Sequence, residues 1–131
     1  MTYVYIDTEF ITVHTAGEYP FLIVEPKGNL QLDQYKAELS NPDILAIIER
    51  NRLPYIYLEL NGLWTIGMDQ QEWTVGPFQV KLKEKGVTKM AIGLAEHVYP
   101  TFSLMAGSYE KKALIETRYF PDLDQMVAFL S

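Results

Sequence analysis

The chain of 131 residues contains no cysteine. Disulfide bonds and thiolate metal sites are therefore both excluded, and nothing in the composition points to an oxidising compartment. Basic residues are also few, because 11 Lys and Arg stand against 17 Asp and Glu and the formal net charge is −6. A negative average field repels phosphate backbones, so we expect no nucleic-acid partner.

Long apolar runs are missing as well. No stretch approaches the roughly 18 apolar residues that a helix needs to span a bilayer, and the first residues lack the basic and apolar regions of a signal peptide. We therefore expect a cytoplasmic protein with no transmembrane segment.

Sequence signatures of catalysis are scarce too. The eight glycines are scattered and form no phosphate-binding loop, and none of the four serines lies in a nucleophile elbow. The two histidines, His14 and His97, fall in or beside predicted turns and lack the spacing of a metal site. We therefore expect no bound metal and no cofactor, and we do not expect an enzyme.

What the chain does contain is enough apolar material for a core. Hydrophobic residues make up 48% and charged residues 21% of the chain, which are proportions typical of a globular protein. A chain of this length has the usual size of one domain. We expect residues 1–131 to form a single domain.

The first half of the chain predicts strands followed by helices. Residues 3–13 are rich in β-branched and aromatic types with polar residues between them, which is typical of a half-exposed strand. Residues 21–24 predict a second strand, so the chain is expected to open with a hairpin. Two short helices follow, divided near Pro42, and residues 55–60 have the composition of a buried central strand.

The second half alternates helix and strand. The predicted order after the central strand is a helix capped by Asp69 and ended by Gly86, a strand over 89–95, a helix after Pro100, a strand over 114–120 and a helix opened by Pro121. Helices between successive strands act as right-handed crossovers. We therefore predict an α/β fold with a mixed, mostly parallel sheet of about five strands, an N-terminal hairpin and covering helices.

This order resembles a known fold family. The pieces that carry the resemblance span about the last eighty residues, namely the strand 55–60, Trp73 and Pro77 in the next helix, and the segments 85–92, 119–123 and 128–130. With them the chain resembles the SpoIIAA-like family, which is the STAS-like fold of anti-sigma factor antagonists, and more narrowly its small stand-alone bacterial members of unknown function. The resemblance implies a non-enzymatic module that binds a protein partner or a small ligand.

STAS domains switch partners through a phosphorylated serine at the start of the helix that follows the central strand. In this chain the corresponding segment, residues 61–69, contains no serine. Thr65 is its only hydroxyl, and we expect Thr65 to precede the helix. The phosphorylation switch of the family is therefore not carried over to this chain.

A candidate contact surface follows the central strand. Ligands of open α/β folds bind near the carboxyl ends of the strands, and Trp64 lies in the loop that follows the central strand. We expect this loop to contact a protein partner or a small apolar ligand, although Trp73 is also expected to pack between helix and sheet. The predicted contact residues are Asn61, Leu63, Trp64, Thr65, Asp69 and Trp73.

Two other functions are kept as alternatives. The sequence Asp7-Thr8-Glu9 at the end of an apolar strand resembles the first motif of the DEDD exonucleases, in which two carboxylates hold Mg²⁺ ions. This motif suggests a metal-dependent phosphodiesterase using Asp7 and Glu9 on one strand face, but short motifs often match by accident, and a solvated strand face with two exposed acids is the simpler interpretation. The other alternative is a structural subunit that forms a homodimer through an edge strand of the first hairpin.

Overall fold

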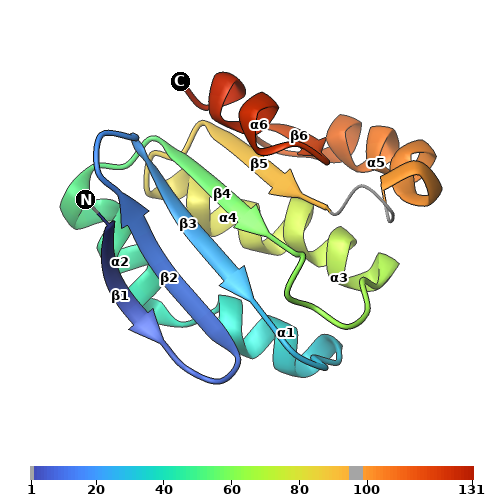
Figure 1. Ribbon diagram of the computed structural model, residues 1–131, viewed down its shortest axis with the longest axis horizontal. Coiled ribbons are helices and arrows are strands. Elements are labelled where there is room, and N and C mark those ends of the chain that lie inside the picture. The colour runs from blue at the N-terminus through green and yellow to red at the C-terminus, as the bar shows by residue number, and fades with distance from the viewer. Residues whose placement is uncertain (1, 95–98) are drawn as a thin grey trace.

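The computed structural model describes residues 2–94 and 99–131. Its six strands are β1 (Thr2–Asp7), β2 (Ile11–Ala16), β3 (Phe21–Pro26), β4 (Tyr55–Glu59), β5 (Lys89–Gly93) and β6 (Glu116–Phe120). They form one sheet in the order of the sequence (Figure 1). The first three strands pair antiparallel, and β3 to β6 pair parallel. The mixed, mostly parallel sheet is the predicted one, with six strands instead of about five.

The opening of the chain is where the prediction was wrong. Residues 3–13 are not one strand, because the chain turns back at Thr8. The Thr8 side-chain hydroxyl accepts hydrogen bonds from the backbone N–H groups of Phe10 (3.2 Å) and Ile11 (3.1 Å). The backbone N–H of Thr8 donates to the Ile11 carbonyl (2.9 Å). A threonine that bonds its own backbone in this way stabilises a turn. The chain therefore opens with a three-stranded meander and not with a two-stranded hairpin.

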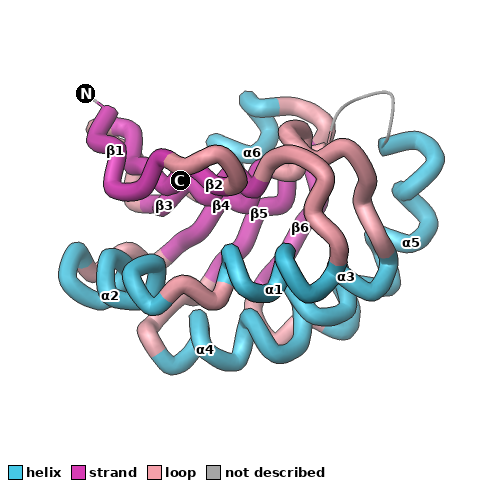
Figure 2. Tube along the Cα trace, turned by 90° about the horizontal axis from the view of Figure 1, so that it is seen from below, coloured by secondary structure: helices cyan, strands magenta, loops and turns pink. Residues whose placement is uncertain are grey.

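The helices lie mostly on one face of the sheet. They are α1 (Leu32–Leu39), α2 (Pro42–Asn51), α3 (Met68–Trp73), the π-helical segment η1 (Thr74–Phe78), α4 (Gln79–Glu84), α5 (Tyr99–Lys112) and α6 (Leu123–Phe129). Helices α1 to α4 cover one face, α5 lies beside β6, and α6 lies on the opposite face (Figure 2). This placement follows from right-handed crossovers between neighbouring parallel strands, which put every connecting helix on the same side.

Local sequence sets the helix boundaries. Helix α3 begins at Met68, one residue before the predicted cap at Asp69, because the Gly67 N–H donates to the Gln70 side chain (3.0 Å). The helical segment is continuous to Glu84, and the π-turn accommodates Pro77, which has no N–H to donate. No described helix has both the length and the apolar character needed to cross a membrane.

Two hydrophobic cores follow from the two faces. The larger core lies between the sheet and the helices α1 to α5, and it includes Leu22, Val24, Ile56, Leu58 and Ile92. The smaller core lies under α6, where Met126 and Leu130 pack on Phe21, Ile23, Tyr57 and Ala91. Because α6 is short, and because it is the one described helix on its face, most of that face over β1 to β3 carries no helix (Figure 1).

Candidate functional site

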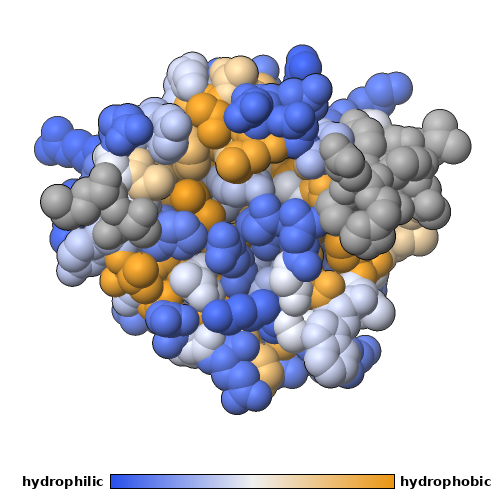
Figure 3. Space-filling model, viewed as in Figure 1, coloured by the Kyte–Doolittle hydropathy of each residue, from blue (hydrophilic) through white to orange (hydrophobic). Residues whose placement is uncertain are grey.

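The face of the sheet that carries α6 contains two adjoining cavities, and we call them the groove and the cleft. Seen from this side, hydrophobic surface lies next to α6 and hydrophilic surface lies in the middle of the face, toward the end of β4 (Figure 3). Period-two alternation along the strands places Ile23, Tyr57 and Ala91 on this face while their neighbours enter the larger core.

The groove is a cavity of about 230 Å³ between β3, β4 and α6. Its strand side is formed by Phe21, Ile23 and Tyr57, with Tyr19 stacked on Phe21 at a ring distance of 5.2 Å. Its helix side is formed by Leu123, Asp124, Met126 and Val127. Apart from Asp124 the lining is apolar or aromatic, so the groove suits the hydrocarbon part of a ligand.

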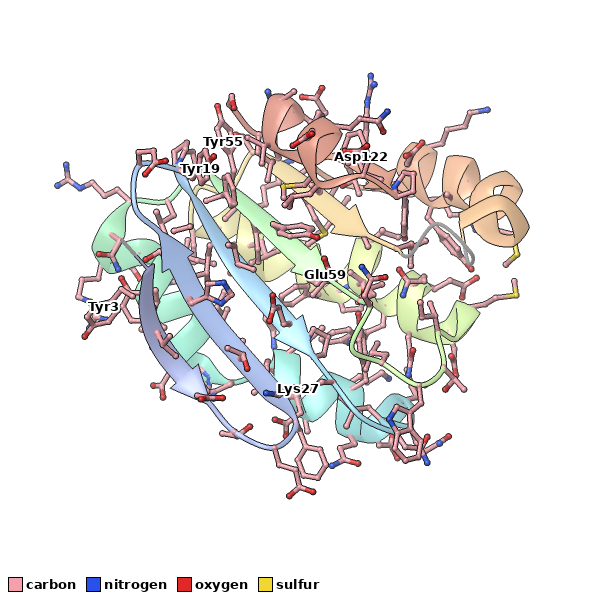
Figure 4. The ribbon with its side chains drawn as sticks, viewed as in Figure 1. Tyr3, Tyr19, Lys27, Tyr55, Glu59 and Asp122 are labelled. Carbon is pink, nitrogen blue, oxygen red and sulfur yellow. The ribbon has the colours of Figure 1, made fainter. Side chains whose placement is uncertain are left out.

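The cleft is a cavity of about 190 Å³ at the carboxyl ends of β4, β5 and β6. It is lined by Glu59 and Asn61 from the end of β4 and by Asp122 from the start of α6, and it shares Tyr57, Leu123 and Met126 with the groove. In Figure 4, Glu59 lies at the end of β4 and Asp122 just before α6. Parallel sheets bind ligands at this edge, so the groove opens onto a polar end at the expected place.

The Glu59 carboxylate is held in place from two sides. The Tyr57 hydroxyl donates a hydrogen bond to Glu59 Oε2, and the Asn61 N–H donates to Glu59 Oε1 (2.9 Å). Burial first, and then the hydrogen bond to Glu59 and the charges of Glu59 and Glu25, raise the pKa of Tyr57 above its ordinary value. Tyr57 therefore stays a neutral donor, and each carboxylate oxygen of Glu59 keeps a lone pair for another donor.

Gly93 allows this arrangement. A Cβ at residue 93 would lie 2.5 Å from the Tyr57 hydroxyl oxygen and 3.0 Å from Glu59 Oε2, distances at which something must shift. Because Gly93 has no side chain, the side chains of Tyr57 and Glu59 can lie over this position of the neighbouring strand β5.

Asp122 is also fixed by the backbone. Its Oδ1 accepts hydrogen bonds from the N–H groups of Asp124 (2.7 Å) and Gln125 (3.3 Å), which makes Asp122 the N-cap of α6. The sequence predicted that Pro121 opens this helix, whereas the helix begins at Leu123 because Asp122 occupies the cap position. The Asp122 carboxylate therefore has two roles: it caps the helix that forms one side of the groove, and it lines the cleft.

The residues that the sequence predicted as one contact surface lie in different environments in the structure. Asn61 lines the cleft. Leu63 is buried in the larger core, and Trp73 is partly buried between Tyr35 and Phe78, at ring distances of 5.9 and 5.4 Å. Thr65 and Asp69 are exposed.

Trp64 is 76% exposed on a loop that is tied to the sheet. The backbone N–H of Trp64 donates to the Gly28 carbonyl (3.1 Å), and Gly28 forms an isolated parallel bridge with Leu63. The segment after the central strand is therefore anchored by its backbone while the indole points outward.

Sequence reasoning missed the residues that matter most in the groove and cleft, namely Tyr57, Glu59 and Asp122. Tyr57 and Glu59 lie on the same strand, β4, whereas Asp122 follows β6 much later in the chain, and these two segments meet only through the pairing of β4, β5 and β6. One signal was present, because Glu59 is a charged residue within the otherwise apolar strand 55–60. A charge in a buried strand calls for a partner, and that requirement points to a site.

The acids of the exonuclease-like motif are not arranged as that hypothesis assumed. Asp7 is the last residue of β1, while Glu9 lies in the turn after it, so the two do not share a strand face. Asp7 lies 3.7 Å from Lys27 Nζ. Within residues 2–94 and 99–131 no group of three His, Asp or Glu side chains could hold a metal. His14 lies on β2, and His97 is outside the described residues.

The strand β1 forms one edge of the sheet, as the dimerisation hypothesis requires. Tyr3 and Val4 on this strand are exposed, and the pairing with β2 is irregular between Val4 and Ile6. Irregular edges discourage pairing with another chain. The homodimer stays a prediction.

These features define a mixed α/β domain with an antiparallel N-terminal meander, a parallel remainder and helices mainly on one face. No protein-family model matches the chain. No curated protein matches it either. Among solved structures it is similar to an uncharacterized protein of the DUF3478 family with a SpoIIAA-like fold from Shewanella loihica PV-4. The identity is 17%, the match covers 92% of each chain, and the TM-score is 0.58.

At this identity the likeness concerns the fold alone. The chain has the SpoIIAA-like fold, which the resemblance in its sequence predicted.

Proposed function

We propose that this protein is a non-enzymatic binding module and that its ligand site is the groove together with the cleft. The observation that carries the proposal is the continuity of the two cavities, which share Tyr57, Leu123 and Met126. Each cavity alone is smaller than the roughly 300–1,000 Å³ of typical small-ligand sites. An occupant that extends through both reaches that size range.

The chemistry of the two cavities favours an amphipathic ligand. The groove offers side chains such as Ile23, Met126 and Val127, and burial of a hydrocarbon chain against them is worth about 0.8 kcal/mol per CH₂ group. The cleft offers fixed polar groups that would orient the other end. A few convergent polar groups beside an apolar wall is the usual composition of a small-ligand site.

A neutral probe tests the groove. In a ¹H–¹⁵N NMR titration, hexan-1-ol is expected to shift the amides of Ile23, Tyr57 and Met126. Val127→Phe fills the groove, because Val127 lines it, and should abolish these shifts. Val80→Phe makes the same change at an exposed valine on α4 and should leave them intact. Shifts that are absent, or that persist in Val127→Phe, would contradict the proposal.

A protein partner that contacts Trp64 is a second candidate function. The observation that favours it is the 76% exposure of this large aromatic side chain on an anchored loop, since tryptophan is enriched in protein interfaces. The proposed test compares capture of partners from the native host by the wild type, Trp64→Ala and Leu114→Ala, where Leu114 is another exposed apolar residue. A partner lost only with Trp64→Ala supports this function, while equal capture by all three removes it.

A further inference from the structure

We propose that the polar end of the ligand is an organic cation, an ammonium or guanidinium group, which lies between Glu59 and Asp122 while its hydrocarbon part occupies the groove. This inference rests on the proposed function and names the ligand class. The occupant is a small amphipathic amine.

The charged side chains that line the two cavities are acidic. Glu59 and Asp122 line the cleft, and Asp124 lines the groove, whereas no Lys, Arg or His is among the described residues that line either cavity. The nearby Lys27 is directed elsewhere, since its Nζ lies 2.8 Å from Thr12 Oγ1 and 3.7 Å from Asp7 Oδ1. The acids of the cleft therefore have no cationic partner of their own in the described chain.

Hydrogen bonds fix the orientation of the two carboxylates in the cleft. Glu59 is fixed by Tyr57 and by the Asn61 N–H, and Asp122 by two N–H groups of α6. Fixed carboxylates cannot turn away when a ligand displaces their water. The two carboxylates would repel an anionic head group. An apolar head group would displace the water around the carboxylates and offer no hydrogen bonds in its place. A cation restores these interactions as charge-assisted hydrogen bonds.

Aromatic side chains also favour a cation in the cleft. Tyr57 and Phe120 both line the cleft. Aromatic faces attract ammonium and guanidinium groups, and this attraction strengthens where water is excluded. The same rings offer little to a hydrated metal ion.

The lining of the cleft suits an organic cation better than a metal ion. Calcium takes six to eight oxygen ligands and magnesium six, whereas only two carboxylates from the described residues line the cleft. The apolar groove that joins the cleft also suits a ligand with a hydrocarbon part, which a metal ion lacks.

The test compares three probes of equal chain length at neutral pH: hexan-1-amine, hexan-1-ol and hexanoate. NMR titrations of the amides of Gly93, Asn61 and Leu123 give the affinities. We expect the amine to bind at least about tenfold more tightly than hexanoate, which corresponds to about 1.4 kcal/mol. The amine should also bind more tightly than hexan-1-ol.

Variants locate the effect. Glu59→Gln should weaken the amine about tenfold and leave hexan-1-ol within about twofold, since only the charged contact is lost. Asp122→Asn keeps a side chain that caps helices well, so it should weaken the amine without loosening α6. Glu116→Gln removes one negative charge from an exposed residue at the start of β6 and should change neither affinity.

The outcomes separate the two proposals. If hexan-1-ol binds in the groove but the amine binds no more tightly than hexanoate, the cationic head group is wrong and the binding module stands. If none of the probes shifts the amides of the groove and cleft, both proposals fail. If N-acetyl-lysine methylamide binds more tightly than hexan-1-amine, the occupant is a side chain of a protein partner, which overturns the assignment to a small amine.

Discussion

At the residue scale, Gln79 shows what one buried polar side chain holds together. Gln79 is fully buried on α4. Its Oε1 accepts hydrogen bonds from the N–H groups of Leu114 (2.9 Å) and Ile115 (3.3 Å), and its Nε2 donates to Thr117 Oγ1 (2.8 Å). One side chain thus ties the helical layer to the segment that leads into β6.

Replacing this glutamine by a methionine of similar size should be costly. Gln79→Met leaves the N–H groups of Leu114 and Ile115 without their acceptor, so we expect a loss of about 2–4 kcal/mol in the free energy of unfolding. Urea denaturation monitored by circular dichroism measures it. The control Gln125→Met, at an exposed position of α6, should stay within about 0.5 kcal/mol. Equal stabilities of the two variants would contradict the role of Gln79.

Buried tyrosines make stability depend on alkaline pH. Burial raises the pKa of Tyr35, Tyr57 and Tyr119 above the ordinary tyrosine value. Because the folded pKa is the higher one, the stabilisation by the neutral rings is complete below the unfolded pKa of about 10 and is lost as the pH rises above it. We expect the urea midpoint to fall above about pH 10, with part of the tyrosinate absorbance appearing only on unfolding. Ionisation of all nine tyrosines in the folded protein would contradict this expectation.

At the element scale, α6 decides whether the groove exists, because its residues Leu123, Met126 and Val127 form one wall. The helix has only seven residues and is stabilised by its N-cap and by packing of Met126 on the sheet. Short helices are marginal without such support.

Removing the N-cap should loosen this wall. Asp122→Ala is expected to lower the free energy of unfolding by about 1 kcal/mol and to speed hydrogen exchange of the α6 amides, whereas Asp122→Asn should do neither. Asp33→Ala, in the first turn of α1 but not at its cap, is the control. Unchanged exchange in Asp122→Ala would show that packing alone holds α6.

The predictability of the elements follows from how local their signals are. The strand 55–60 and the alternation after it were predicted well, because apolar runs, prolines and glycines mark them in the sequence. The turn at Thr8 was missed, since threonine is enriched in strands and only its side-chain hydrogen bonds to the N–H groups of Phe10 and Ile11 mark the turn. The sequence could not show that Glu59 and Asp122 line the same cleft, because this depends on the order of the strands in the sheet.

At the scale of the whole molecule, the arrangement of crossovers explains why the face that carries the proposed site is left open. The described helices that connect β3 to β6 lie on one side of the sheet or beside β6, and α6 is the one described helix on the other side (Figure 2). The net charge of −6 adds an average field that attracts cations to the molecule.

This field predicts a salt dependence. Between about 0.01 M and about 1 M salt the Debye length falls from about 30 Å to about 3 Å, so screening should weaken hexan-1-amine binding severalfold. Binding of hexan-1-ol should weaken little or strengthen, because it depends on apolar burial. Parallel titrations at the two salt concentrations measure both. Equal salt dependence of the two probes would contradict an electrostatic contribution to recognition.

Intermolecular nuclear Overhauser effects from bound hexan-1-amine would show directly whether the groove and the cleft together bind an amphipathic ligand. We predict contacts from its terminal methyl group to the methyl groups of Ile23 and Met126, and from the methylene beside nitrogen to the Gly93 amide. Contacts to side chains between the sheet and α1 to α4, or an absence of contacts to Ile23 and Met126 at saturating amine, would contradict such binding.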